Sequence, residues 1–342
     1  SKGTGLFQTV LTELKMPAEA FLHCGDHLLA DVAGAKAFGL STAHFVQDNP
    51  HIQEINRMYA LASHYIDPAF RATKALYLPH RAQLATHLAP DSEQGHLIGY
   101  GVLGPILYPF ADFILKTIQG LNHPKVAFLL RDGYLPSLLV ETLAHEKIGA
   151  NVRISRFAGF AASFASKADI DSYLAERIGS ARFEDMARQL LLPPKLMSKV
   201  IALTEDKPTA EKKFLQFIHE PDVIKTIIDA STHYRKRLML YLEKTLQLKA
   251  NDTLLLVDLG YTGTVQNRLT SILKAEANIN VEACYFLALQ TPQNVGKRTG
   301  LLDERQFDEA TRRMLVSYIA LLEQVCTSLD KSVIDYTETG DP

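Results

Sequence analysis

The chain has 342 residues, 47% of them hydrophobic, so it can bury a sizeable core, and its length favours two domains. A formal net charge of -2 gives no electrostatic reason to expect binding to nucleic acid or to an anionic membrane surface. No apolar run approaches the ~20 residues that span a bilayer, and no signal peptide is visible. The three cysteines match no zinc or disulfide spacing, which favours a reducing, cytoplasmic setting.

Residues 1–47 have the pattern of alternating helices and short strands. The predicted elements are a helix over residues 6–14, a strand over 20–23, a helix over 32–39 and a strand over 40–45. Asp26 follows the first strand directly after Gly25, and Asp31 comes from the start of the next helix. We therefore expect the two carboxylates to share one site at the carboxyl end of the strand. Because the chain begins inside a folded element, we expect it to be a fragment of a longer protein.

Lys2 and the segment FLHCGDHLLADVAGAKAFG resemble the C-terminal half of the haloacid dehalogenase (HAD) superfamily core. In that family a lysine stabilises the nucleophile and the substrate phosphate, and a Gly-Asp-x-x-x-x-Asp signature supplies magnesium ligands. The resemblance implies that Lys2 is catalytic and that Asp26 and Asp31 bind Mg²⁺. The alternative is an acidic loop that matches the signature by chance.

The nucleophile of the HAD family lies in an Asp-x-Asp motif that precedes the lysine, and no such motif lies upstream of Lys2. The nucleophile forms the covalent intermediate, so we expect this chain by itself to lack phosphatase activity. For the complete protein, the resemblance implies a HAD-type phosphohydrolase. Segments such as FLLRDGYLP and LLLVDLGYTGTVQ also resemble large HAD-like predicted hydrolases that carry a long C-terminal extension.

Residues 48–120 are predicted to form a helical linker, because prolines break an otherwise helical pattern into pieces. The glycine-rich apolar stretch 99–118 is predicted to be a buried helix preceded by a turn. Residues 121–342 are predicted to form a parallel-sheet α/β domain with a helical insertion at about 167–250. The predicted fold class is therefore α/β, with a partial Rossmann-like HAD core segment, a helical linker and this domain.

The α/β domain opens with a strand, helix and strand over residues 125–130, 135–145 and 151–155. This βαβ unit fixes a parallel strand pair. Arg131 and Asp132 follow its first strand, and Arg156 follows its second.

The stretch DTLLLVDLGYTGTVQNRL predicts a second strand, loop and helix, followed by another strand over residues 280–289. The strand 254–257 ends on Asp258, and a loop with two glycines and two threonines leads into the helix. Such a loop directs backbone N–H groups and a helix N-terminus at an anion such as phosphate. A plain βα turn without a ligand is the alternative. The loop residues of interest are Gly260, Thr262, Gly263 and Thr264.

Parallel strands place their carboxyl ends on one edge of a sheet, so the residues that follow these strands are expected to converge. Arg131, Asp132, Arg156, Asp258 and the glycine–threonine loop would together suit a phosphorylated sugar or nucleotide. The alternative is structural: Arg131 pairs with Asp132, and Asp258 caps its own loop. LLLVDLGYTGT also resembles the ribose-phosphate loop of type I phosphoribosyltransferases, although Leu259 replaces the second acid of that family and the loop is one residue shorter.

The C-terminal part is predicted to contain an exposed basic loop at Lys297 and Arg298, a helix over about 308–323 and a last edge strand over 332–337. For the basic loop GKRTG, the alternative is contact with a phosphate. Two classes of function remain open. One is a HAD-type enzyme with a second domain that binds a phosphorylated metabolite, and the other is a binding or scaffold module without chemistry. The sequence does not indicate an oligomeric state.

Overall fold

The computed structural model describes residues 5–45, 95, 98–130, 132–205, 207–291, 294–328 and 331–342. The chain has an α/β fold, as predicted, and divides into two compact units, residues 1–105 and 106–342. Lys2, Arg131 and most of the predicted linker lie outside the described residues. Within the described part of the chain, no helix is both long enough and apolar enough to cross a membrane.

The first unit is built around two short parallel strands. Its elements are α1 (Leu6–Leu14), η2 (Ala18–Ala20), β1 (Leu22–Gly25), η3 (Leu28–Ala33), α2 (Gly34–Ala37), β2 (Ser41–His44) and η5 (Gly99–Leu103). Leu22 pairs with Ser41 at the start of the strand pair. Phe7, Ala35 and Leu40 form a small core beside the strands. The helix after β1 starts earlier than predicted, with the π-helical turn η3.

The second unit contains a five-stranded sheet in which every neighbouring pair is parallel. Its strands are β3 (Lys125–Leu129), β4 (Ala150–Val152), β5 (Thr253–Asp258), β6 (Asn280–Leu287) and β7 (Arg298–Leu302), in the spatial order β4-β3-β5-β6-β7. The unbroken apolar run of β5 fits its central place, where both faces are covered. Both predicted βαβ units belong to this one sheet.

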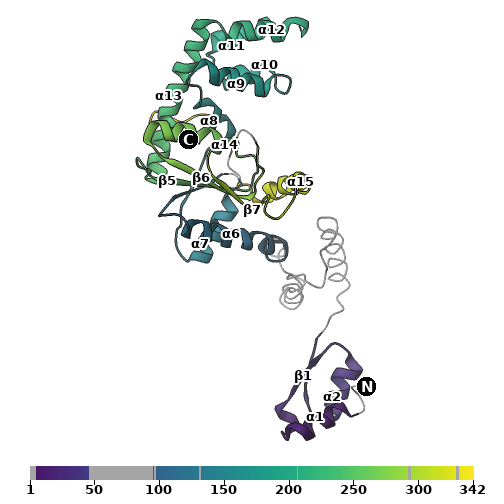
Figure 1. The fold of residues 1–342 in the computed structure, drawn as a ribbon. Helices are drawn as coiled ribbons and strands as arrows, with labels where there is room; N and C mark the ends of the chain where they lie inside the picture. Colours follow the sequence, from purple (N-terminus) through teal and green to yellow (C-terminus); the bar gives the residue numbers. More distant parts are fainter. Residues whose placement is uncertain are drawn as a thin grey trace. The chain divides into compact units, whose positions relative to one another are not determined.

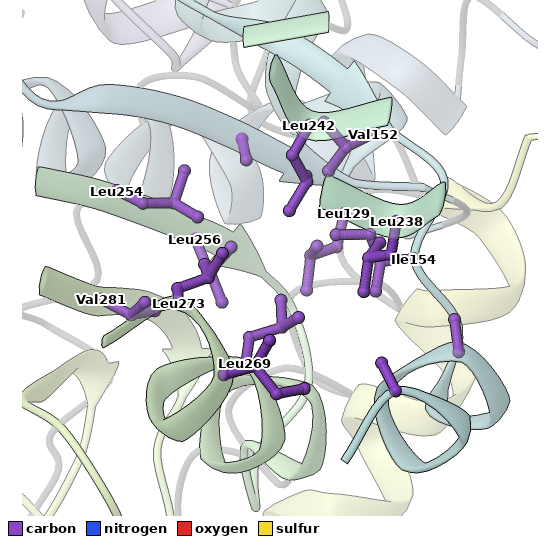
Figure 2. Close-up of a cluster of buried hydrophobic side chains, with 14 of the residues drawn as sticks. Leu129, Val152, Ile154, Leu238, Leu242, Leu254, Leu256, Leu269, Leu273 and Val281 are labelled. Carbon is purple, nitrogen blue, oxygen red and sulfur yellow. The ribbon is translucent and has the colours of Figure 1, made fainter. Parts of the chain in front are cut away.

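Helices cover both faces of the sheet (Figure 1). One face carries α6 (Gly104–Gln119), α7 (Tyr134–Ala144) and α15 (Glu309–Cys326), and the other carries α8 (Arg156–Ala161), α13 (Pro221–Leu246) and α14 (Thr264–Ala277). After β3 the chain adds the next strand, β4, on one side of the central pair, and after β5 it adds β6 on the other side. Because both crossovers are right-handed, α7 and α14 lie on opposite faces of the sheet. Figure 2 shows the core between the sheet and the helices α13 and α14, to which Leu254, Leu256 and Leu269 belong.

A helical block fills the chain between β4 and β5, as predicted. It consists of α9 (Lys167–Arg177), α10 (Phe183–Gln189), α11 (Pro194–Thr204), α12 (Lys207–Ile218) and the first part of α13. These helices bury a second core, in which Phe214, Phe217 and Ile227 are almost fully enclosed. The second part of α13 packs on the sheet through Leu238 and Leu242.

Four local features differ from the sequence predictions. The helix α6 buries Phe110 against Phe286 of β6, so it belongs to the sheet unit and not to a linker. Lys297 is exposed and precedes β7 as predicted for a loop, but Arg298 is the first residue of β7 and is buried. The strand β4 ends at Val152, and Arg156 is the first residue of α8. Residues 332–337 form no strand and run as an irregular segment.

Candidate functional site

A pocket of about 610 Å³ lies at the carboxyl edge of the five-stranded sheet, where β3 and β5 end. The strand order reverses here, because the chain continues from β3 to β4 on one side and from β5 to β6 on the other. Open α/β sheets bind ligands at such a reversal. The polar residues that line the pocket include Asp132, Arg153, Ser155, Arg156, Asp258, Thr262, Thr264, Tyr285, Glu323 and Lys331.

Every predicted ligand-binding residue that the structure describes lines this pocket. The set consists of Asp132, Arg156, Asp258, Gly260, Thr262, Gly263 and Thr264. Arg131, the remaining member, lies outside the described residues. The parallel strands thus bring these residues together as expected, and the ligand itself stays a prediction.

The loop between β5 and α14 lines the pocket with groups that can bind an anion. Gly263 is the N-cap of α14 and has left-handed backbone angles, φ 67° and ψ 36°, which glycine adopts without steric cost. No side chain among the described residues caps the helix, so the first N–H groups of α14 remain available to a ligand. The helix dipole adds a partial positive charge at the same point. The hydroxyl oxygens of Thr262 and Thr264 lie 3.5 Å apart at the pocket wall.

Three carboxylates from separate elements border the pocket. Asp132 follows β3 and accepts a hydrogen bond of 2.9 Å from the hydroxyl of Thr327. Asp258 ends β5, and Glu323 lies on α15. The Glu323 carboxylate reaches the loop so closely that a Cβ atom on Gly260 would lie 3.2 Å from its Oε1 atom.

The crowding of these acids changes the proton affinity of Asp258. Burial raises the pKa of its carboxyl to about 7, and the negative charges of Asp132 and Glu323 act in the same direction. The backbone N–H of Leu259 donates a 2.8 Å hydrogen bond to Asp258 Oδ1 and opposes part of the rise. Asp258 therefore does cap its own loop, as the structural alternative proposed, and it also faces the pocket.

Cationic side chains border the pocket as well. Arg156 is exposed and opens α8, whose N-cap Ser155 accepts a hydrogen bond from the N–H of Ala158. The sequence predicted Arg156 at a strand end, but the early end of β4 and the serine cap place it one short loop further on. Arg153 and Lys331 also line the pocket, and neither was predicted.

The C-terminal segment forms one wall of the pocket. Residues 331–334 line it, and the next buried side chain, Tyr336, donates a 2.7 Å hydrogen bond to the carbonyl of Arg153. Ser155 donates to the carbonyl of Val333 at 2.6 Å. These bonds run from side chain to backbone, which explains why a strand-like pattern in the sequence produced no strand.

No protein-family model matches this chain, and no curated protein matches its sequence. The resemblances to the HAD superfamily and to the phosphoribosyltransferases therefore stay predictions.

One further charged residue lies at the site, in the segment for which the sequence favoured an exposed loop over contact with a phosphate. Arg298, the first residue of β7, is 7% exposed and lies beneath the loop. Its Nη1 atom donates to the carbonyl of Thr262 at 2.8 Å, and its Nη2 atom donates to Asn267 Oδ1 at 2.6 Å. The sequence GKRTG has the composition of an exposed turn. Only the apolar Leu301 and Leu302 that follow gave any sign of a strand.

The first unit holds the predicted magnesium ligands. Asp26 is exposed and directly follows β1, whereas the carboxyl of Asp31 is buried against Gly25, the last residue of that strand. Both residues thus adjoin the carboxyl end of β1. A hydrogen bond of 3.1 Å joins Asp31 Oδ1 to His23 Nε2, and the N–H of His27 donates to Asp31 Oδ2 at 3.2 Å.

The surroundings of these two acids match part of a metal site. Among the described residues, no group of three or more His, Cys, Asp or Glu side chains is placed to hold a metal ion. Magnesium, however, usually binds one or two carboxylates together with waters and substrate phosphate. Both oxygens of Asp31 already bond to His23 and to the His27 N–H, so the two acids supply at most part of such a site, and Mg²⁺ stays a prediction.

Proposed function

We propose that the second unit binds a phosphorylated sugar or nucleotide in the pocket at the carboxyl edge of its sheet. The observation that carries this proposal is the uncapped N-terminus of α14, which adjoins the pocket and begins directly after Gly263. The phosphate would accept hydrogen bonds from the first N–H groups of α14 and from the hydroxyls of Thr262 and Thr264. Charge-assisted bonds of this kind are worth about 1.5–3 kcal/mol each.

The acids across the pocket indicate the rest of the ligand. Carboxylates accept hydrogen bonds, so Asp132 and Asp258 suit the hydroxyl groups of a sugar better than a second phosphate. The exposed Arg156 and Lys331 also line the pocket and can receive additional negative charge. A phosphate and a set of hydroxyls in one small molecule match this division of charge.

The choice between an enzyme and a binding module depends on Asp258. With a pKa of about 7, its carboxyl is partly protonated at neutral pH and can accept or donate a proton. If the unit is a binding module, the wild-type protein catalyses no reaction of the ligand, and Asp258→Asn should bind the ligand with unchanged affinity. If the unit is an enzyme, the same change should preserve binding and remove turnover.

The first unit adds a second, separate part to the proposal. Asp26 and Asp31 would hold Mg²⁺, which would neutralise charge on a substrate phosphate in a HAD-type phosphohydrolase. The support is the contact between Asp31 and Gly25, which only a glycine permits, since a Cβ atom there would lie 2.3 Å from Asp31 Cγ. The Gly-Asp pattern at that strand end therefore has a steric reason.

The binding proposal is tested by thermal unfolding of the full chain with inorganic phosphate, with ribose 5-phosphate and with unphosphorylated ribose. A ligand at ten times its Kd stabilises the folded state by about 1.4 kcal/mol, so both phosphate compounds should raise the melting temperature and ribose should not. Thr264→Val should weaken the shift. Thr270→Val is the matched control, because Thr270 lies on the same helix outside the pocket and its hydroxyl bonds to the Gln266 carbonyl within that helix. Equal shifts in the two variants, or no shift with any phosphate compound, would refute the proposal.

A further inference from the structure

Arg298 is a buried cation with an incomplete set of partners. Its guanidinium bonds to the Thr262 carbonyl and to the Asn267 side chain, both of which are uncharged acceptors. Its Nε atom is buried and has no hydrogen-bond partner in the described part of the chain. A buried polar group of this kind is costly unless something compensates it.

The charge of Arg298 is also unpaired. Nearby Lys297 and Arg305 form ion pairs with Glu282 and Asp303. Arg298 pairs with no carboxylate among the residues that the structure describes. Burial lowers the pKa of its guanidinium from the usual value, yet an arginine keeps its proton in a protein. The unliganded unit therefore holds a positive charge for which the described residues supply no counter-ion.

The position of this charge is informative. A Cβ atom on Gly263 would lie 2.8 Å from Arg298 Nη1, so the guanidinium packs directly against the N-cap of α14. Thr262 and Gly263 line the pocket, whereas Arg298 does not. The charge thus sits behind the loop, on the far side of the backbone from the ligand space, and adds to the positive end of the helix.

We propose that Arg298 is a positioning residue that supplies, from behind the loop, the buried counter-charge for a doubly charged phosphate. The inference rests on the proposed function and adds a specificity to it. The guanidinium binds the Thr262 carbonyl behind the loop, which directs the loop N–H groups towards the pocket. Its charge favours a phosphate dianion over a monoanion or a carboxylate. A buried charge is screened little by salt, so this preference should persist at high ionic strength, unlike the attraction of the exposed Arg156.

Asn267→Asp is the sharpest test, because it neutralises Arg298 without touching the pocket. The new carboxylate would occupy the place of the Asn267 amide, whose Oδ1 atom accepts from Arg298 Nη2 and from the N–H of Val295. The affinity for inorganic phosphate, measured by calorimetry on the full chain at about pH 8, should fall about tenfold. The melting temperature without phosphate should stay the same or rise, since the buried cation gains an ion pair.

Ser271→Asp is the matched control, because it adds the same charge to an exposed position of α14, one turn further on. Its phosphate affinity should stay within about a factor of two of the wild-type value, since exposed charges are screened. Arg298→Gln should lose as much affinity as Asn267→Asp, and Arg298→Lys, which keeps the charge, should recover most of it.

The outcomes separate the two proposals. If the wild-type chain does not bind phosphate, the proposed function is wrong and this inference falls with it. If the wild-type chain binds phosphate and Asn267→Asp binds it equally well, only the role of Arg298 is wrong. A lysine variant that binds no better than the glutamine variant would also refute the assignment of a charge role to Arg298.

Discussion

Replacing Asp258 by asparagine should make the protein more stable at neutral and alkaline pH. The folded state raises the pKa of this carboxyl from 3.8 to about 7, chiefly through burial and then through the charge of Asp132. Between these two values the folded chain keeps a proton that the unfolded chain releases. The free energy of unfolding therefore falls as the pH rises through this window, and the loss is complete above pH 7.

The size of the effect follows from the shift. Each unit of pKa corresponds to about 1.4 kcal/mol, which gives an upper limit of about 4 kcal/mol for a fully enclosed carboxyl. Asp258 lines an open pocket and retains some contact with solvent, so we expect on the order of 2 kcal/mol. Asparagine keeps an oxygen that can accept from the N–H of Leu259, and it carries no charge for the neighbouring acids to repel.

Urea unfolding of both proteins, followed by circular dichroism at about pH 5 and pH 8, measures this difference. The difference in the free energy of unfolding, variant minus wild type, should be larger at pH 8 than at pH 5 by on the order of 2 kcal/mol. Titrating groups far from Asp258 are common to the two proteins and cancel in the comparison. A difference between variant and wild type that is the same at both pH values would refute the reasoning.

Three further predictions concern the scaffold of the pocket. Gly263→Ala should lower the free energy of unfolding by about 1–2 kcal/mol and weaken phosphate binding, because φ is 67° and the new Cβ would press on Arg298. An unchanged midpoint of urea unfolding would contradict this. Phe110→Ala should cost about 3–5 kcal/mol in urea unfolding, since the ring is fully buried against Phe286; a loss below about 1 kcal/mol would mean that α6 is peripheral to the sheet. Tyr336→Phe should cost about 1 kcal/mol, because the hydroxyl bonds to a backbone carbonyl, and thermal unfolding that does not change would show that this bond contributes nothing.

The placement of most candidate residues followed from the sequence because it depends on one rule. The strands 125–130 and 254–257 were predicted from their unbroken apolar runs, and the carboxyl ends of parallel strands lie on the same edge of a sheet. Once the strands were recognised, Asp132, Asp258 and the loop had to converge. The order of the strands was not needed for that conclusion.

Three of the residues that sequence reasoning did not place at the site share a different property. Arg298, Glu323 and Lys331 reach the site from elements that are distant in the chain, and their charges indicate solvent exposure when they are considered alone. The burial of Arg298 depends on the loop that packs over it, which no local pattern reports. The same holds for residues 332–337, where the sequence pattern predicted a strand. Hydrogen bonds between side chain and backbone, from Ser155 to Val333 and from Tyr336 to Arg153, hold this segment instead of backbone pairing with a strand.

The long helix α13 limits how this fold can change in length. Its first part contributes Val223 and Ile227 to the core of the helical block, and its second part contributes Leu238 and Leu242 to the core on the sheet. Between them, Ser231 bonds to the Ala161 carbonyl at 2.7 Å. Each residue added to a helix turns everything beyond it by about 100°. A single insertion near Ser231 would thus turn one of the two apolar faces out of its core, whereas the short connections between α9 and α12 can gain or lose residues without this penalty.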